Sequence, residues 1–567
     1  MDVDRRTFLL TGLGVAGAVV LGACTDNAED GSSAGEESSP ATGDGSEPVQ
    51  RPTLRLGAIS GDWGLPSPFT HQALPGYLRM SLLYDTLLWA DSTGELLPWL
   101  AKSFERSTDG LTYTFQLRDG VEWHDGKPFT ADDVAFTFGY YANLQLPFTV
   151  VGQPQNVAEV KASGDTTVEV RLERPAVTFP VLVAGAVPIV PRHIWESVRD
   201  PLAVADPKLL VGTGAYLLDS YSSADGTYKF SANDDYFLGR PFVQGIEFPP
   251  VGDELTALQA GDIDAGQTPN NGVRDDVLAP LRADDSLGVI EDKAGFAYPL
   301  YFNAANGGPL ADVRFRQAFA HAVDRNDIVE RLVGGNGAPG SPGFVPPDHP
   351  FFSDPEQYPY DIDEANRLLD DAGFTRDDGG TRIGPDGPLQ FGLLFQAEAS
   401  ALVDLLVPAL AEVGVELRPE ATDGPAGLFS RKFSRQYDII LLFFPGPVGP
   451  GPGGDPDYLR LIFATSPMPT FFTPDGFASP EFDQLAAEQL VATDPDKRAE
   501  LIGQMQDLIA EQVVVLPLYY ADQFFAFRTE VFDQWYYTPT DFPSAAAYNK
   551  QAFITGTMTG TAIRPTT

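Results

Sequence analysis

Few residues in this chain have the types and spacing that covalent or metal chemistry requires. After residue 52 the sequence contains neither the nucleophile-elbow pattern G-x-S-x-G nor the zinc-protease pattern H-E-x-x-H. A single cysteine excludes an intramolecular disulfide, a multi-thiolate zinc site and an iron–sulfur cluster. The histidines are too far apart for a local metal-ligand motif: His71, His124, His193, His321 and His349. We therefore predict no catalytic residue, no metal site and no cofactor, although a hydrolase site assembled from distant residues stays open.

Two short acidic motifs have both a chemical and a structural interpretation. His124-Asp125-Gly126 could bind a metal or act in catalysis, but we interpret it as a turn between a hairpin and the following helix. Asp262 and Asp264 could bind a cation. A calcium loop, however, needs more oxygen ligands at alternate positions and a final glutamate, so we predict a solvated turn here.

The N-terminus predicts export and lipid attachment. A charged start, an apolar stretch too short to span a membrane and small residues before a cleavage site describe a signal peptide over 1–23. Arg5 and Arg6 begin a sequence that resembles the twin-arginine export motif. The only cysteine, Cys24, ends Leu21-Gly22-Ala23-Cys24, which resembles a lipoprotein box. The alternative is a buried N-terminal helix with an incidental cysteine.

Composition separates a tether from a folded body. Residues 24–52 are mostly Gly, Ser, Glu, Asp, Pro and Ala, which cannot bury enough apolar surface to fold, so they predict a flexible tether. The remaining residues of the 567 are enough for more than one domain. The net charge of −42 disfavours nucleic acid and anionic lipid as partners of the folded surface.

Helices and strands alternate along the body, which predicts a large mixed α/β fold. The strongest strand pattern is 111–118, and Thr130 can cap a helix over 131–143. Near-helical spacing of apolar residues runs over 312–333. Three further helices have clear start signals, at Asp361 with Glu364, at Ser479-Pro480 and at Asp494-Pro495. We also expect strands at 437–442 and 513–520.

Several blocks together resemble a known family over about 53–550. They include Leu83-Tyr84-Asp85-Thr86-Leu87, Leu97-Pro98-Trp99-Leu100-Ala101, residues 115–134, Gly212-Thr213-Gly214-Ala215-Tyr216, Phe302-Asn303 and Gly454-Asp455-Pro456-Asp457-Tyr458. This series is similar to the extracytoplasmic solute-binding proteins of family 5, the peptide- and nickel-type receptors of ABC importers. An exported lipoprotein is a natural form for such a receptor.

The resemblance implies a two-lobed, periplasmic-binding-protein-like α/β fold of the class II or cluster C type, with an extra subdomain and a hinge. Lobe I would comprise 53–92, 186–297 and 530–567, and the subdomain packed on it 93–185. Lobe II would comprise 298–529. The implied partners are a peptide or small-molecule ligand between the lobes and the permease subunits in the membrane. We expect a monomer that contacts the membrane only through its lipid.

Candidate ligand-binding residues also follow from the resemblance. The first ligand loop of the family falls on 60–69, where Trp63 and Phe69 could stack on a ligand. Peptide receptors of the family carry a carboxylate that pairs with the ligand's amino group, and the matching position here is Pro452, within a Pro/Gly run over 445–454. We expect Asp455 to be a helix N-cap that could also face the ligand. The remaining candidates are Tyr216, Asn303 and Tyr458.

Other functions stay open beside the importer receptor. The ligand could be a non-peptide solute such as a nickel chelate or a sugar, since nickel can be held through a small chelator. A sensory or chaperone-like surface lipoprotein could use the same fold. An exported hydrolase is the remote alternative.

Overall fold

A computed structural model describes residues 53–57, 60–90, 96–142, 144, 156–422, 425–444, 455–466, 470–533, 550, 554 and 564–565. All of them belong to the unit Gln50–Thr567. The predicted signal peptide, tether and export and lipidation residues Arg5, Arg6 and Cys24 lie outside the described residues, as does the Pro/Gly run 445–454.

The N-terminal half of the unit carries two sheets. One has the strand order β1-β10-β9-β8, in which β1 and β10 are parallel and the other pairs antiparallel. The other is antiparallel with the order β4-β5-β7-β6. Their bounds are β1 Leu54–Arg55, β4 Ala101–Arg106, β5 Thr112–Leu117, β6 Val157–Ser163, β7 Thr167–Leu172, β8 Tyr216–Ser222, β9 Thr227–Ala232 and β10 Gly245–Phe248; a short pair is β2 Leu88–Ala90 with β3 Leu96–Pro98.

A mixed sheet with the order β11-β20-β12-β19-β17-β18 occupies the rest of the chain. β17 is parallel to both β18 and β19, whereas β12 and β20 are antiparallel to their neighbours. The bounds are β11 Ala265–Gln267, β12 Leu287–Phe302, β17 Gln390–Gln396, β18 Glu416–Thr422, β19 Ile439–Leu441 and β20 Val515–Arg528, with β13 Gly337–Pro339 paired to β20. Minor strands are β14 Thr375–Arg376, β15 Arg382–Gly384, β16 Gly387–Pro388, β21 Phe532–Asp533 and β22 Arg564–Pro565.

The helices are short, and six of those in the described residues begin at a side-chain cap. Asp361, Ser479 and Asp494 accept hydrogen bonds from backbone N–H groups of the first helical turn, which confirms the three start signals. The helices are α2 Ala73–Ser81, α3 Ala131–Ala142, α4 Arg192–Trp195, α5 Glu254–Ala260, α6 Asp275–Arg282, α7 Val313–Ala322, α8 Arg325–Val333, α9 Ile362–Asp371, α10 Ser400–Glu412, α11 Pro425–Phe433, α12 Tyr458–Phe463, α13 Pro480–Val491 and α14 Pro495–Gln512.

One expected helix is two helices in the structure. The chain leaves helical geometry at Val323, and the carboxylate of Asp324 then caps α8 by accepting hydrogen bonds from two backbone N–H groups. The apolar spacing over 312–333 therefore comes from α7 and α8, which both pack into one core.

Within the part of the chain that the structure describes, four clusters of buried apolar residues form the cores. The first core gathers residues from Leu54 to Phe248, with Ala265, Phe525, Phe527 and Ile554. The second and third cores gather residues from Ala297 to Ala521. A small fourth cluster lies under α5 and α6. The first core is thus separated from the second and third cores at about residues 250–297 of the chain. Phe525, Phe527 and Ile554, late in the chain, belong to the first core again.

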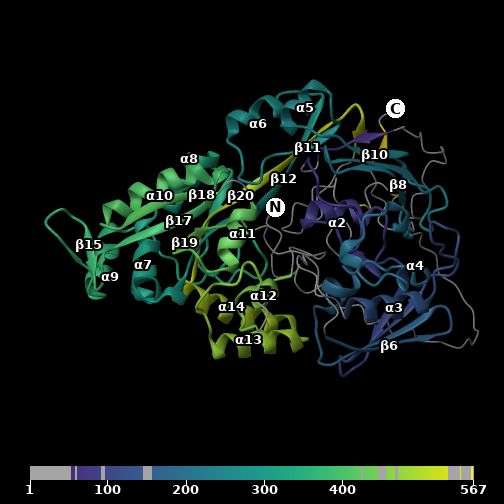
Figure 1. Cartoon of the computed structure of the whole chain (residues 1–567), viewed down its shortest axis with the longest axis horizontal. Coiled ribbons are helices and arrows are strands. Elements are labelled where there is room, and N and C mark those ends of the chain that lie inside the picture. The colour runs from purple at the N-terminus through teal and green to yellow at the C-terminus, as the bar shows by residue number, and fades with distance from the viewer. Residues whose placement is uncertain are drawn as a thin grey trace, which may run out of the picture. The chain divides into compact units, whose positions relative to one another are not determined.

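Strands β12 and β20 belong to both sides of this division. Leu287–Asp292 pairs with 523–528, and Phe296–Tyr301 pairs with 515–521; the register is irregular between Asp292 and Phe296 and again between Ala297 and Pro299. Phe525 and Phe527 pack in the first core, whereas Leu516 and Leu518 pack in the second. Figure 1 shows the two strands running side by side. An irregular ladder between two cores is a place where the chain can bend.

An ion pair fixes β1, at the start of the folded body, to the residue before β11. The Arg55 guanidinium donates to both Asp264 oxygens (2.6 and 3.2 Å), and the Arg55 backbone N–H donates to Asp264 Oδ2 (2.8 Å). Asp264 is almost fully buried, so the expectation of a solvated turn at this residue is wrong. The carboxylate instead joins β1 to the turn before β11.

The Gly-Thr-Gly block at 212–214 requires its glycines for close packing. A Cβ on Gly212 would lie 1.8 Å from the carbonyl oxygen of Leu83, and one on Gly214 would lie 2.3 Å from that of Leu82. His124 fixes the same block, because its Nδ1 accepts from Gly212 N–H (3.2 Å) and its Nε2–H donates to the Gly214 carbonyl (2.9 Å). This confirms a structural role for the His124 turn.

Candidate ligand-binding site

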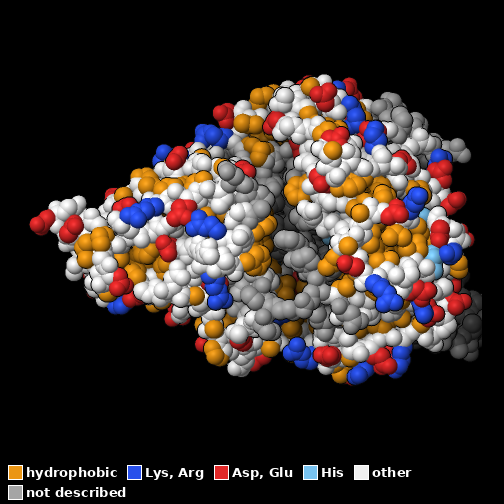
Figure 2. All heavy atoms as spheres, viewed as in Figure 1, with side chains coloured by type: hydrophobic (Ala, Val, Ile, Leu, Met, Phe, Trp, Pro, Cys, Tyr) orange, Lys and Arg blue, Asp and Glu red, His pale blue; other side chains and the backbone are white. Residues whose placement is uncertain are grey.

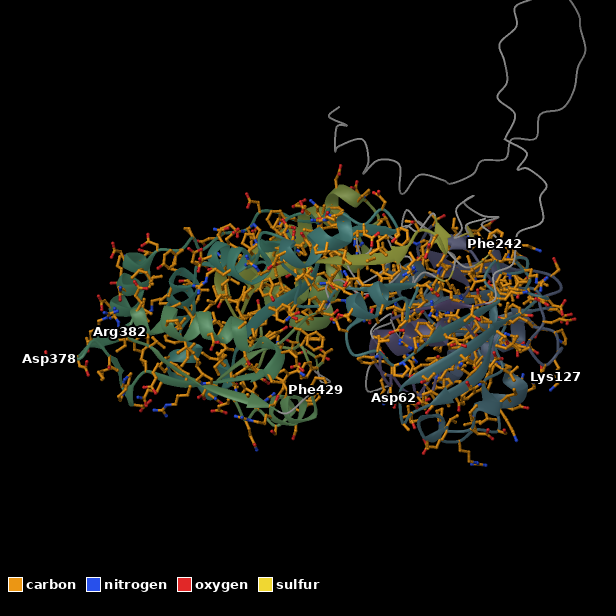
Figure 3. The ribbon with its side chains drawn as sticks, turned by 90° about the horizontal axis from the view of Figure 1, so that it is seen from above. Asp62, Lys127, Phe242, Asp378, Arg382 and Phe429 are labelled. Atoms are coloured by element: carbon orange, nitrogen blue, oxygen red, sulfur yellow. The ribbon has the colours of Figure 1, made fainter. Side chains whose placement is uncertain are left out.

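The loop after β1 is held by tyrosines of β8 and β9. The Asp62 carboxylate accepts from Tyr221 Oη–H (2.7 Å) and from the Gly64 backbone N–H (3.0 Å). The Trp63 backbone N–H donates to Tyr228 Oη (2.8 Å). Burial raises the pKa of Tyr228 to about 12, so this phenol stays protonated and can donate to the Gly64 carbonyl (2.9 Å). Trp63 is therefore presented, half-buried, on a fixed loop; Figure 3 labels the adjacent Asp62.

Phe69, at the end of the same loop, is a core residue. Its ring centroid lies 5.5, 4.9 and 4.7 Å from those of Tyr140, Tyr141 and Trp195, and its side chain is buried. Such edge and tilted contacts are typical of aromatic packing. The structure thus assigns packing to Phe69, and a ligand contact by this residue stays a prediction.

Three further candidates are buried, and each donates a side-chain hydrogen bond to a main-chain carbonyl. Tyr216 Oη–H donates to Val243 (3.1 Å) and Tyr458 Oη–H to Phe344 (2.7 Å). Asn303 Nδ2–H donates to the Tyr437 carbonyl (2.9 Å). A buried polar group needs such a partner, so each residue contributes to the fold. Their expected ligand contacts also stay predictions.

The Asp455 carboxylate forms an ion pair with an arginine. Arg498 of α14 donates to both carboxylate oxygens of Asp455 (2.6 and 3.0 Å), and the Asp457 backbone N–H donates to one of them (2.8 Å). The helix α12 begins after Asp457, so the expectation that Asp455 is its N-cap is wrong. A ligand ammonium would have to compete with Arg498 for this carboxylate.

The same network extends to a second buried acid. Asp457 accepts from the Arg460 guanidinium (2.6 and 2.8 Å) and from Gln489 Nε2–H (2.5 Å). Burial raises the pKa of Asp457, although the arginines oppose the shift. Burial disfavours the charge of Arg498, but attraction to Asp455 outweighs it and raises the pKa of Arg498. The network fixes α12, α13 and α14 to one another.

The described chain before the Pro/Gly run ends at the ladder between the cores. Phe444 exchanges two backbone hydrogen bonds with Ala297 of β12, each 2.8 Å. Its ring packs against Phe344, Tyr458 and Phe472 (5.0, 5.5 and 5.1 Å). The described chain before the Pro/Gly run therefore ends beside Ala297, at the irregular part of the β12–β20 ladder.

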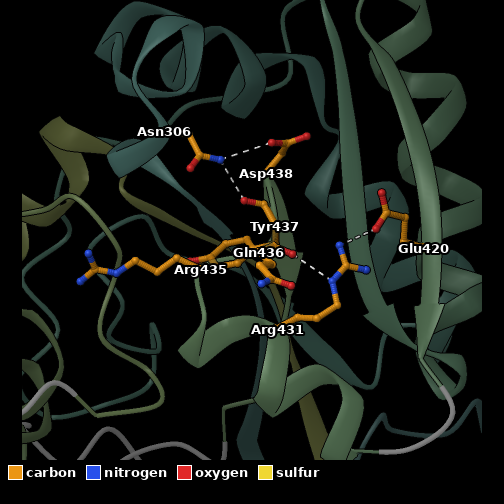
Figure 4. Close-up of a pocket in the computed structure, with 7 residues that line it drawn as sticks. All are labelled: Asn306, Glu420, Arg431, Arg435, Gln436, Tyr437 and Asp438. Carbon is orange, nitrogen blue, oxygen red and sulfur yellow. Dashed lines mark hydrogen bonds and ion pairs between the residues drawn. The ribbon is translucent and has the colours of Figure 1, made fainter.

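A shallow depression on the surface is a weaker candidate. It measures about 300 Å³ and is lined by Asn306, Glu420, Arg431, Arg435, Gln436, Tyr437 and Asp438 (Figure 4). Its arginines are already paired: Arg431 with Glu420 (2.6 Å) and Arg435 with Asp475 (2.9 Å). Paired arginines on an open surface gain little from an added anion, so we do not assign this depression to the ligand.

The described residues show neither a metal site nor a membrane helix. No group of three or more His, Cys, Asp or Glu side chains within them could hold a metal ion. None of their helices has the length and apolarity that crossing a membrane needs. On the face in Figure 2, acidic and basic side chains are interspersed.

Comparison with known proteins identifies the family. Residues 95–468 match the bacterial extracellular solute-binding proteins, family 5 Middle. The chain belongs to this family. Its fold is accordingly the two-lobed α/β fold.

Relatives extend over most of the chain. The dipeptide-binding protein of Escherichia coli strain K12 is 27% identical over 478 residues, which cover 79% of this chain and 85% of that protein. The oligopeptide-binding protein AppA of Bacillus subtilis, solved with a nonapeptide, has a TM-score of 0.75 at 21% identity and covers 88% of this chain and 99% of its own. NikZ of Campylobacter jejuni, solved with Ni(L-His), has a TM-score of 0.73 at 23% identity, with 85% and 94% covered.

Sequence reasoning missed the partners of the buried acids. Arg498 lies 43 residues from Asp455, and no local spacing connects them. The sequence does contain one signal, because an acidic residue followed by proline, as in Asp455-Pro456, is typical of a helix start. This signal marks Asp455 but does not indicate Arg498 as its partner.

Removal of the arginine should leave a buried carboxylate unpaired. We expect Arg498→Met to lower the free energy of unfolding by about 3–5 kcal/mol. Arg331→Met is the matched control, because the Arg331–Asp327 pair is solvent-exposed and contributes about 0–1 kcal/mol. Urea denaturation of both variants measures the difference; equal stabilities would contradict the network.

Proposed function

We propose that this chain is a lipid-anchored, extracytoplasmic receptor of an ABC importer, which captures a solute between its lobes and delivers it to the permease. The family match over 95–468 carries the proposal. The strands β12 and β20, which pass through both sets of cores, support a closing motion. The receptor acts without chemistry on its solute, as a monomer that binds the membrane only through its lipid.

The proposed lobes follow the division of the cores, except that Phe525 and Phe527, within the bounds of lobe II, pack in the first core. Lobe I comprises 53–92, 186–297 and 530–567, with the subdomain 93–185 packed on it, and lobe II comprises 298–529. In support, the first core combines residues of the proposed subdomain, such as Phe115 and Phe179, with residues of lobe I, such as Tyr216 and Ile246. Ile554 supports the return of the C-terminus to lobe I.

A peptide or peptide-like molecule is the first candidate solute. Its support is the similarity to the dipeptide-binding protein of Escherichia coli and to AppA with its nonapeptide. The fixed loop after β1 would place Trp63 against the ligand, since an aromatic wall with a few polar anchors is typical of ligand clefts. Asp62 on the same loop offers a carboxylate on the exposed side.

A non-peptide solute is the second candidate, and the state of Asp455 favours it. The position that carries the ammonium-binding carboxylate in peptide receptors is Pro452, and the nearby Asp455 is paired with Arg498. A solute without a free amino group needs neither residue. A chelate is one such form, as in NikZ with Ni(L-His). The net charge of −42 favours a neutral or cationic solute in either case.

Native mass spectrometry of the gently purified full chain tests the proposal. We expect a population heavier than the bare protein by one solute, which denaturation releases chemically unchanged. Peptides among the released molecules would support the first candidate, and a single non-peptide species would support the second. A chain that carries no added mass, and that no peptide or nickel–histidine mixture stabilises against heat, would contradict the receptor function; so would turnover of the solute.

Lipid anchoring is tested by removal of the thiol. We expect Cys24→Ser to move the protein from the membrane fraction to the soluble fraction, because the lipid at this residue is the proposed anchor. Arg5→Lys with Arg6→Lys should prevent export through the twin-arginine route. Retention of the Cys24→Ser protein in the membrane fraction would contradict the anchor, and normal export of the double variant would point to the general secretory route.

A further inference from the structure

A buried carboxylate lies in the middle of the first core. Asp85, between α2 and β2, is completely buried. Its Oδ1 accepts from Trp99 Nε1–H (2.8 Å) and Tyr236 Oη–H (3.1 Å), and its Oδ2 accepts from Thr213 Oγ1–H (2.9 Å). These donors come from three separate segments of the chain. All three are neutral, and neutral donors alone leave the charge of a buried carboxylate uncompensated.

The compensating charge comes from the far end of the chain. Lys550 Nζ lies 2.5 Å from Asp85 Oδ1 and donates to the Tyr84 carbonyl (3.1 Å). Both charged side chains are 0% exposed. The two residues are 465 positions apart, so the contact joins Lys550, late in the chain, to the first core.

Two indoles complete the surroundings of the amine. Lys550 Nζ lies 4.3 Å from the ring centroid of Trp89 and 5.4 Å from that of Trp99. An ammonium within about 6 Å of an aromatic face is attracted by the negative charge density of the ring, more strongly where water is excluded. A carboxylate, a carbonyl and two indoles around one cation are the groups that recognise an alkylammonium ion. Burial lowers the pKa of Lys550, and attraction to Asp85 opposes that shift.

We propose that Asp85, Trp89 and Trp99 form an alkylammonium-binding site whose ligand is Lys550 of the chain's own C-terminal segment. The site docks this segment on the first core, where Ile554 is also buried. Its geometry comes from α2, β2 and the Trp99, Thr213 and Tyr236 segments, all far from Lys550 in sequence. The site therefore keeps its shape when the lysine is removed and then accepts a free alkylammonium ion.

Chemical rescue of a lysine variant tests the proposal on the full chain. We expect Lys550→Ala to lower the melting temperature by about 3 °C or more. n-Butylammonium chloride should restore at least half of that loss, whereas 1-butanol at the same concentration and sodium chloride at the same ionic strength should restore none. Lys127→Ala is the control, because Lys127 is 56% exposed in its pair with Asp125 (Figure 3) and its loss should change neither the melting temperature nor the response to n-butylammonium.

An unchanged melting temperature of the Lys550→Ala variant, or equal rescue by 1-butanol, would overturn the proposal. A second measurement on the unaltered protein covers the case in which the variant does not fold. Acetylation by an N-hydroxysuccinimide ester, followed by mass spectrometry of peptides, should modify Lys550 at least tenfold more slowly than the exposed Lys102 and Lys127. Modification of Lys550 at the rate of Lys127 would show an accessible amine and overturn the site.

Discussion

The ladder between β12 and β20 is the interaction on which the two lobes depend. Each strand contributes side chains to the first core and to the second core, so the ladder links the two. The ladder is interrupted where the cores separate, between Asp292 and Pro299. The paired stretches on either side of the interruption keep the cores joined, and we expect bending to concentrate in the few residues at the interruption. A bending motion of this kind is the hinge closure known for two-lobed binding proteins.

Four interior carboxylates of this strongly acidic protein follow one pattern. Asp85, Asp264, Asp455 and Asp457 each lie in the interior, and each is bound by a lysine or arginine. For three of the four, the partner lies on a distant segment; Arg460 is the exception, one helical turn from Asp457. A buried ion pair adds little net stability but is costly to break, so it favours the one arrangement in which both charges are paired. The motif residues Asp85, Trp99 and Thr213, which carried the resemblance to the family, meet in one such cluster.

The sequence predicted helix starts and strand faces that depend only on residues close together in the chain. The caps at Asp361, Ser479 and Asp494 are decided within four residues, and alternation along 112–117 matches the buried and half-buried faces of β5. β20 was predicted too short, ending at 520 instead of 528, because it is buried on both faces and shows no alternation. β12 was not predicted at all.

The candidate site was harder to predict than the fold. The resemblance gave the family and the loop at Trp63, but it could not show that Phe69, Tyr216 and Tyr458 would be buried. Burial depends on contacts with distant segments, as between Tyr458 and Phe344. Likewise, the proximity of Asp455 to a proline indicated a helix start, but the true partner of its carboxylate is Arg498 on another helix.

Hinge closure about β12 and β20 is the central claim, and X-ray scattering measures it most directly. The full chain would be compared with and without a saturating concentration of the solute that mass spectrometry identifies. A decrease in the radius of gyration at saturation, together with loss of the change when the solute is removed, is the predicted result. Identical scattering curves with and without bound solute would contradict closure about these strands.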